Sequence, residues 1–503
     1  MSSAEVDVLV VGAGPTGLTA AGDLARAGRS VTVLERRPTM NPGSRAFATM
    51  ARTLEVLDAR GLADGLLTRA HRAPSVTIFG GARIDLTHLD SRYPFAMVTP
   101  QANVDRALEH YAVAHGARIR RGVDVVGLAQ DADGVIVTGC DPQGRRTRWR
   151  AAYVIGADGA HSGVRRMTGI DFPGRTLLSS IVLADVKLAD GPTGEGLALH
   201  STPDVFAFLA PYDRRDADGA WFRAMVWDRA RQLPDHAPAD RMEIIGVLRR
   251  AMGADPGVVD VGWASRFHCD ERQVPQYRRG RVFLAGDAAH VHSPMGGQGM
   301  NTGIQDAANL AWKVDAALGG APDAVLDTYH DERHPIGQRV LMQSGMMARG
   351  ITLRPRGMRA VRNLFAPRLL RIPTVRDAVA GGFAGTTLRY PHAAGESALV
   401  GTRATQVPLV GCRLTELQRT PGFVLAGERG TQPVVAENVL HAERSDGGPA
   451  VLIRPDGYIA WAGRSADRSA WQGMLGKWTG AGAQPAALGL IGGQVPPGSA
   501  VNS

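Results

Sequence analysis

The chain has 503 residues, of which 44% are hydrophobic, and its formal net charge is +9 at pH 7. This length is too great for one hydrophobic core, so we expect two or three domains. No run of about 18 apolar residues is present, which excludes a membrane-spanning helix. The three widely spaced cysteines, Cys140, Cys269 and Cys412, exclude a disulfide framework and favour a reducing cytoplasm.

The excess positive charge does not indicate a nucleic-acid partner. Only Lys187, Lys313 and Lys477 are lysines, and the arginines are spread along the chain rather than gathered in one stripe. The densest basic run, residues 145–150, follows a turn-like DPQG sequence and predicts a solvated hairpin. A basic protein nonetheless favours an anionic cofactor or substrate.

The first 35 residues predict a βαβ unit. A buried strand over residues 6–11 leads into a Gly-rich turn, an amphipathic helix over 17–27 that stops at Gly28, and a second strand over 30–35. The apolar start runs straight into this unit, so we interpret it as a strand rather than a signal peptide. The pattern opens a doubly wound α/β fold.

The turn of this unit has the spacing of a dinucleotide-binding fingerprint. Gly12 permits a tight turn, Gly14 lets the backbone approach a pyrophosphate, and Gly17 lets the helix pack on the strand. Pro15 and Thr16 precede the predicted helix, whose free N–H groups favour phosphate. Glu35 ends the second strand and can bind an adenosine ribose. Arg36 can also suit a 2′-phosphate, so this segment alone fits either a nicotinamide nucleotide or a bound flavin.

Residues 52–57 and 103–115 predict further helices, and residues 179–267 then change to alternating apolar and polar positions. A period of two predicts an antiparallel sheet, which we interpret as the floor of a substrate chamber. Bulky side chains on these strands belong either to the core or to the chamber wall. They are Phe206, Phe208, Trp221, Met225 and Trp227.

Residues 282–290 return to the buried-strand pattern, so the cofactor domain is predicted to be discontinuous in sequence. Asp287 ends this strand and can bind the polyol of a ribityl chain. The Gly-rich segment 294–307 then enters a helix expected over 306–318, and its N–H groups can meet the negative N1–C2=O edge of a reduced flavin. His290 and His292 form an HxH pair with no third ligand evident nearby, so we predict no metal site.

Residues 324–371 are predicted to be mostly helical, and Asp331 and Glu332 there to form a salt-bridge cluster at a helix end. After Pro391, short strands are expected at 408–409, 423–426, 450–454 and 458–462, within a third, small α/β domain. The last residues are expected to form a disordered tail.

Three segments in order, residues 11–17, 155–165 and 282–301, carry a resemblance to a known family. The chain resembles the class A FAD-dependent monooxygenases related to p-hydroxybenzoate hydroxylase, from Val6 to about Pro335. Within them it is most similar to the branch that hydroxylates aromatic polyketides. That branch has a C-terminal thioredoxin-like domain without a redox pair, which residues 451–463 resemble.

The resemblance implies a set of FAD-binding residues. Arg45 and Pro294 match residues that position the flavin, Gln101 the ribityl contact, Val125 the adenine contact, and Asp158 with Gly159 a motif serving both FAD and NAD(P)H. No general acid or base is implied. The whole implied cofactor set is Gly12, Gly14, Pro15, Thr16, Gly17, Glu35, Arg36, Arg45, Gln101, Val125, Asp158, Gly286, Asp287, Pro294, Gly297, Gly299, Met300 and Asn301.

The expected fold is therefore α/β and α+β, with a Rossmann-type FAD domain interleaved with a substrate-binding sheet domain and followed by the thioredoxin-like domain. The expected divisions are 1–75, 100–178 and 280–335 for the FAD domain; 76–99 and 179–279 for the substrate domain; 336–389 for a helical connection; 390–490 for the third domain; and 491–503 for the tail.

The implied activity is hydroxylation of an aromatic, polycyclic polyketide substrate. NADPH or NADH reduces FAD, and dioxygen then gives a flavin C4a-hydroperoxide that transfers oxygen. Baeyer–Villiger insertion and oxidative inactivation of an antibiotic remain alternatives on the same scaffold, as do a non-oxygenating flavin dehydrogenase and a flavin-binding protein. The expected partners are the substrate and dioxygen, with no nucleic acid or membrane, for a monomer or homodimer.

Overall fold

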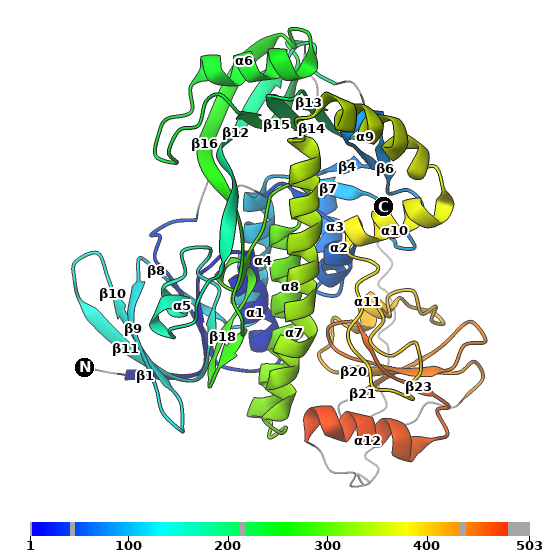
Figure 1. Cartoon of the computed structure of the whole chain (residues 1–503). Helices are drawn as coiled ribbons and strands as arrows, with labels where there is room; N and C mark the ends of the chain where they lie inside the picture. Colours follow the sequence, from blue (N-terminus) through cyan, green and yellow to red (C-terminus); the bar gives the residue numbers. More distant parts are fainter. Residues whose placement is uncertain are drawn as a thin grey trace, which may run out of the picture.

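The computed structural model describes residues 3–40, 46–192, 194, 196–211, 217–431 and 439–480. Two large sheets and one smaller domain are grouped around the helices α7 (Gly299–Leu318) and α8 (Ala324–Ile351). In Figure 1 the first sheet lies at the lower left, the second sheet at the top and the C-terminal domain at the lower right, with α8 running between them.

The first sheet is built on β1 (Ser3–Val11), which pairs in parallel with both β2 (Val31–Glu35) and β11 (Arg146–Gly156). Val8, Leu9 and Val10 have no exposed surface, because helices cover the faces of a parallel sheet. Its strand order is β17 (Arg278–Arg279), β18 (Val282–Leu284), β11, β1, β2 and β8 (Arg118–Arg121). The strands β9 (Asp124–Gln130) and β10 (Val135–Cys140) extend from β11.

Two sequence predictions are confirmed in this sheet. β18 pairs in parallel with β11, so the cofactor domain is interleaved with the rest of the chain. β10 and β11 form an antiparallel hairpin, and the basic run at 145–150 follows its turn, with residues 146–150 in β11. The helix α1 (Pro15–Arg26) packs against α7 and against α4 (Gln101–Ala114), which places the N-termini of α1 and α7 at one edge of the sheet.

The second sheet confirms the predicted antiparallel layer. Its order is β19 (His290–Val291), β16 (Val258–Gln273), β12 (Gly174–Leu188), β15 (Ala220–Asp228), β14 (Val205–Pro211), β13 (Leu197–Ser201), β5 (Ser75–Thr77) and β6 (Arg83–Asp85). Helix α6 (Arg241–Met252) covers one face, where Ile244 and Leu248 pack with Phe222 and Val226. Because side chains alternate along a strand, Met225 and Trp227 lie on the opposite face.

The remaining elements connect these layers. They are the short sheet of β3 (Ala48–Thr49), β7 (Ala96–Val98) and β4 (His71–Ala73); the helices α2 (Ala51–Asp58), α3 (Ala63–Leu67), α5 (Gly163–Met167), α9 (Arg356–Leu369) and α10 (Pro373–Ala384); and the short turns η1 (Phe79–Gly81) and η2 (Gly286–Ala288). Helix α7 begins seven residues before the predicted start at Asp306. The expectation of a helix end at Asp331 and Glu332 is wrong, because both lie inside α8.

The C-terminal domain contains α11 (Leu414–Leu417), β20 (Phe423–Gly427), β21 (Val439–Glu443), β22 (Ala450–Ile453), β23 (Ile459–Gly463) and α12 (Arg468–Thr479). Its sheet order is β21, β20, β22, β23, and only the β20–β21 pair is parallel. Strand β21 was not predicted, and at 408–409 Leu409 makes only an isolated bridge with Arg444. The predicted tail, 491–503, lies outside the described residues.

Candidate active site

Two adjoining cavities, of about 560 and 630 Å³, lie where the N-termini of α1 and α7 meet. Because they share several lining residues, they form one elongated space. The shared residues are Gly14, Gln101, Ala157, Gly159, Ala160, His161 and Asp287. The first cavity continues toward the second sheet, and the second ends at β2 and β9.

The three fingerprint glycines differ in what surrounds them. A Cβ on Gly12 would lie 2.4 Å from the carbonyl oxygen of Ala157, and one on Gly17 would lie 2.0 Å from the carbonyl oxygen of Gly12. A Cβ on Gly14, by contrast, would meet no protein atom within 4 Å. Gly12 and Gly17 are therefore required by the packing of the chain, whereas Gly14 leaves open space in front of the N-terminus of α1.

Glu35 lies at the end of the second cavity. One carboxylate oxygen accepts a 2.8 Å hydrogen bond from the Ala13 N–H, and the other accepts a 2.9 Å bond from the Arg37 N–H. These bonds fix the carboxylate beside the fingerprint turn. Arg36, Val125 and Arg121 line the same end of the cavity, so a nucleoside placed there meets both signs of charge.

Asp158 joins β11 to α5. Its carboxylate accepts hydrogen bonds from the N–H groups of Gly163 and Val164, at 2.6 and 3.1 Å, and from the Ser162 hydroxyl at 2.5 Å. A carboxylate at this point satisfies the free N–H groups of the first helical turn. Asp158 thus fixes the loop between the cavities, in which Gly159 has a φ of +83°.

The buried carboxylate of Asp306 fixes the segment around Asp287. Asp306 accepts hydrogen bonds from the Gly286 N–H at 3.2 Å, His290 Nε2 at 2.6 Å and Arg333 Nε at 2.7 Å. Although burial opposes ionisation, Arg333 and His290 hold the pKa of Asp306 below its usual value. Gly286 has a φ of +58°, and a Cβ there would lie 2.5 Å from Thr16 Oγ1, so α1 and the Asp287 turn are in direct contact.

The predicted flavin loop closes the first cavity. Pro294, Gly297, Gly299 and Met300 line it, together with Pro15 and Thr16. Asn301 does not line either cavity. Its side chain accepts from the Met50 N–H at 2.8 Å and donates to the carbonyls of Ala48 and Gly297 at 3.0 and 2.6 Å, which ties the loop to β3.

His290 and His292 stack with an interplanar angle of 9°, and His292 lines the first cavity. Burial, with the charge of His290, lowers the pKa of His292 to about 4, so its imidazole is neutral near pH 7. Among the described residues, no group of three or more His, Cys, Asp or Glu side chains could hold a metal ion.

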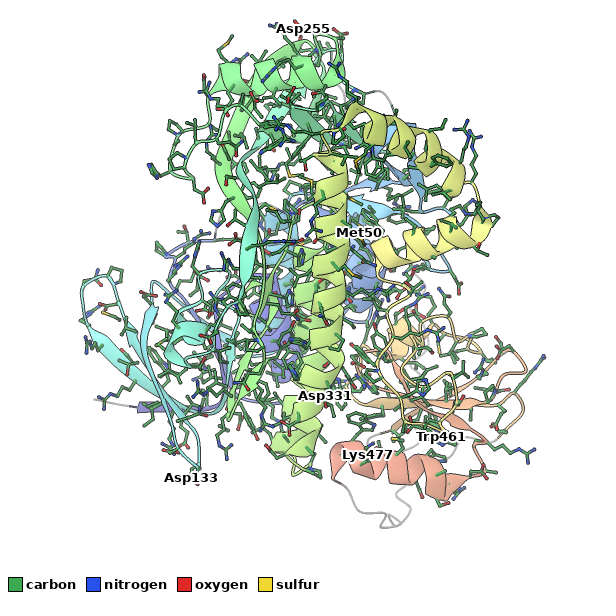
Figure 2. The ribbon with its side chains drawn as sticks, viewed as in Figure 1. Met50, Asp133, Asp255, Asp331, Trp461 and Lys477 are labelled. Carbon is green, nitrogen blue, oxygen red and sulfur yellow. The ribbon has the colours of Figure 1, made fainter. Side chains whose placement is uncertain are left out.

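The five candidate substrate residues separate into two groups. Met225 lines the first cavity and, with Phe208, a neighbouring apolar pocket of about 30 Å³. Phe206 and Trp227 are buried and stack on each other at 5.7 Å, and neither lines these spaces. Trp221 also lies away from them, near Gly262 on β16. Figure 2 shows Met50, which lines the apolar pocket, near the middle of the molecule.

Several residues that line the cavities were missed from the sequence. Phe47, Leu183, Phe267 and Cys269 line the first cavity beside the predicted loop. They carry no motif, and only alternation along β12 and β16 could have indicated Leu183 and Phe267. Arg45, predicted to position the flavin, lies outside the described residues.

The cavity fits FAD. Its length spans two lobes, Gly14 leaves open space at a helix N-terminus where a pyrophosphate binds, and Glu35 and Asp287 lie in the two lobes. Flat rings require an approach free of side chains, and Gly297 and Gly299 provide it in the first lobe.

Comparisons with known proteins agree with this site. A family model described as FAD binding domain matches residues 5–344, and one described as Aromatic-ring hydroxylase, C-terminal matches residues 397–482. The chain therefore belongs to the FAD-dependent aromatic-ring hydroxylases. It is a flavoprotein monooxygenase with FAD as cofactor and NAD(P)H as reductant.

Among its relatives is the 12-dehydrotetracycline 5-monooxygenase/anhydrotetracycline 6-monooxygenase of Streptomyces rimosus, 38% identical over 90% of this chain and 95% of the relative. Rifampicin monooxygenase of Streptomyces venezuelae is 36% identical over 91% and 95%. The solved structure of OxyS anhydrotetracycline hydroxylase from Streptomyces rimosus has a TM-score of 0.82 and 35% identity, covering 95% of this chain and all of that one. Within the described residues, no helix is both long and apolar enough to cross a membrane.

Proposed function

We propose that this monooxygenase hydroxylates an electron-rich ring of a polycyclic aromatic polyketide. The observation that carries the proposal is the position of Met225 and Phe208, on an apolar sheet face that meets the predicted flavin loop at Pro294. A flat apolar substrate lying on that face would have one edge at the loop. The names of the relatives, which include anhydrotetracycline monooxygenases, support this substrate class.

Bound FAD supplies hydride acceptance from NAD(P)H and activation of dioxygen. The chain supplies binding and orientation. We propose that Gly14 admits the pyrophosphate beside the turn formed at Gly12, that Glu35 binds the ribose of adenosine, and that Asp287 binds the ribityl chain. Pro294 would border the flavin ring.

The N-terminus of α7 has a second role in this proposal. Gly299 and Met300, in the first turn of α7, line the first cavity, and the positive end of a helix stabilises negative charge that develops there. The chamber is walled by Leu183, Phe267 and Phe47, which exclude water from the reacting edge. We assign no general acid or base.

The proposal also covers the setting of the enzyme. Cys140, Cys269 and Cys412 are all unpaired, which supports a reducing cytoplasm, where NAD(P)H is available. Burial raises the pKa of Cys269 to about 12, so its thiol stays protonated and unreactive beside the chamber.

The test measures NAD(P)H oxidation by the purified holoenzyme with a panel of polycyclic phenols and rifampicin, under labelled dioxygen. Substrate-stimulated oxidation with one labelled oxygen in a phenolic product supports the proposal. A labelled lactone would instead indicate Baeyer–Villiger insertion. An altered product without label would indicate a non-oxygenating role, as the name of a 32% identical relative, dialkyldecalin synthase, suggests for that protein.

A further inference from the structure

Helix α9 directs its apolar side chains away from the protein. Met358, Val361, Phe365 and Leu369 follow the i, i+3, i+7, i+11 spacing of one helix face, and Leu364 borders it. The first three are 56%, 55% and 52% exposed, and Leu364 and Leu369 are similarly exposed. A surface helix normally turns such a stripe toward the core. We call these five residues the outer face of α9.

The orientation of α9 is fixed by its opposite side. Arg359 is buried and donates hydrogen bonds to the carbonyls of Ser201 and Thr202, at 2.8 and 3.0 Å. Asn363 packs against the turn η1, where a Cβ on Gly80 would lie 2.6 Å from the Asn363 Cα. Rotating the helix to bury its outer face would break these contacts. The contacts of Arg359 and Asn363 therefore keep the outer face exposed.

The outer face is surrounded by positive charge. Residues 352–379 contain seven arginines and one acidic residue, Asp377. Arg356, Arg368 and Arg371 are exposed and make no ion pair with any residue in the described part of the chain. Exposed apolar surface next to guanidinium groups without ion pairs favours a partner that is both apolar and anionic.

We propose that the outer face of α9 docks on the surface of an anionic lipid bilayer. A basic amphipathic helix lies in the interface, with its apolar stripe among the acyl chains and its cations at the phosphates. A second copy of this chain fits less well, because a symmetric contact would bring Arg368 and Arg371 of both copies together. The proposal concerns surface docking, and no membrane-spanning helix is involved.

Docking here would serve the proposed function, on which this part of the inference rests. Ala366 on the inner side of α9 and Leu370, which directly follows the helix, pack in the same apolar cluster as Ile78 and Phe208, which line the apolar pocket. In Figure 1, α9 lies at the upper right edge of the molecule, beside α10. A polycyclic substrate dissolved in the bilayer would therefore be presented one helix away from the chamber wall.

Flotation of the holoenzyme with vesicles tests the proposal. We expect it to bind equimolar phosphatidylcholine–phosphatidylglycerol vesicles at low salt, to bind pure phosphatidylcholine weakly, and to be released by high salt. Val361→Ser/Phe365→Ser and Arg368→Gln/Arg371→Gln should each weaken partitioning by about tenfold or more. Both pairs are exposed, so we expect the variants to fold, and their thermal midpoints verify this.

Matched control variants remove exposed apolar and basic side chains from surfaces other than the outer face of α9. Val113→Ser/Val259→Ser replaces two exposed valines on other surfaces, and Arg146→Gln/Arg148→Gln removes two exposed arginines from the β10–β11 hairpin. Both should bind vesicles like the unchanged protein. If the outer-face variants bind equally well, or the unchanged protein does not float with anionic vesicles, the docking proposal is wrong.

Light scattering measures the oligomeric state and so tests whether a second copy of this chain covers the outer face. A dimer that Val361→Ser/Phe365→Ser converts to monomer would assign the outer face to a second copy and overturn lipid docking. NAD(P)H oxidation with a water-soluble phenol is measured in parallel on every variant. Loss of vesicle binding with unchanged oxidation separates docking from catalysis, whereas absence of oxidation in all proteins would count against the proposed function alone.

Discussion

Arg454, which follows strand β22 of the C-terminal domain, donates hydrogen bonds of 2.5 and 2.8 Å to the two carboxylate oxygens of Glu332 on α8. Lys313 on α7 donates a third, at 2.7 Å, and Asp456 binds Arg454 from the other side. All four side chains are buried. The C-terminal domain is therefore joined to the helices of the flavin site through a fully enclosed ion cluster.

Glu332→Gln should destabilise the enzyme. Although burial opposes ionisation, Arg454 and Lys313 hold the pKa of Glu332 well below its ordinary 4.5. Removing its charge leaves two buried cations with one carboxylate, which costs about 3–5 kcal/mol when a buried pair is broken. Denaturant unfolding near pH 7 measures this. The stabilisation from a lowered pKa is complete above the unfolded value of 4.5 and is lost progressively as the pH falls toward the folded value, so the difference should shrink as the pH falls below 4.5.

Asp331→Asn is the matched control. Asp331 adjoins Glu332 on α8, but its side chain is exposed. Figure 2 labels Asp331 beside the lower half of this helix. Its replacement should change stability by less than about 0.5 kcal/mol. Equal effects of the two substitutions would contradict the role given to the buried cluster.

Gly14→Ala and Gly17→Ala should fail in different ways. The added methyl at Gly14 meets no protein atom, so the variant should fold with unchanged stability but lose FAD affinity by at least about tenfold, because the methyl fills the space for the pyrophosphate. At Gly17 the methyl overlaps the Gly12 carbonyl, so stability itself should fall. Flavin absorbance after gel filtration and thermal unfolding of the FAD-free proteins distinguish the two. A Gly14→Ala protein that retains FAD would contradict the assigned pyrophosphate position.

Asp105→Asn should stabilise the FAD-free protein at pH 8 and have little effect at pH 4. Asp105 is 5% exposed beside the second cavity, and burial, with the charge of Glu109, raises its pKa to about 7 against the hydrogen bond from Gln101. The folded state therefore binds more protons than the unfolded state between pH 3.8 and about 7, and stability falls across that range. The gain at pH 8 should be ~2–4 kcal/mol. Unfolding midpoints at both pH values test this, and equal gains at pH 4 and 8 would contradict it.

Met225→Ala and Phe206→Ala should have different effects, because Met225 lines the proposed substrate chamber and Phe206 belongs to the hydrophobic core. Met225 lines the first cavity, so shortening it should raise the substrate KM and the peroxide released per NAD(P)H oxidised. Phe206 is stacked on Trp227 away from the cavities, so its loss should lower stability by about 3–5 kcal/mol with little effect on coupling. Steady-state kinetics with peroxide assay, alongside thermal unfolding, compares the two. Uncoupling by Phe206→Ala alone would reverse the assignment.

The elements that the sequence could predict depend on local geometry. Gly12 and Gly28 have φ of +105° and +87°, and such turns leave a signature in the residues themselves. The order β1, α1, β2 could be predicted because glycine turns mark the ends of these elements. Asn301 is different, because its amide bonds to Met50 and to Ala48 of β3, which lie 251 and 253 positions away. No residue near Asn301 in the sequence indicates that contact.

The sequence also did not reveal which side chains of the long helices are buried. The spacing of Met358 and Val361 shows that α9 is amphipathic, but not which side meets the protein; Arg359 and its carbonyl partners decide that. Glu332 looked like a helix-end acid because nothing near it in sequence reveals Arg454, 122 residues further on. Strand β21, with His441 and Glu443 among its residues, lacks the apolar run that identified β20 and β22.

The parallel pairing of β18 with β11 also governs the order in which the enzyme matures during synthesis. The fingerprint helix α1 leaves the ribosome early, but Asp287 and the first turn of α7 follow it by about 270 residues, after most of the second sheet. Domains fold as units during synthesis, and this one has no complete cofactor cavity until α7 is made. A nascent chain that does not yet include α7 cannot bind FAD. Flavin therefore binds late in synthesis, once the interleaved fold is complete.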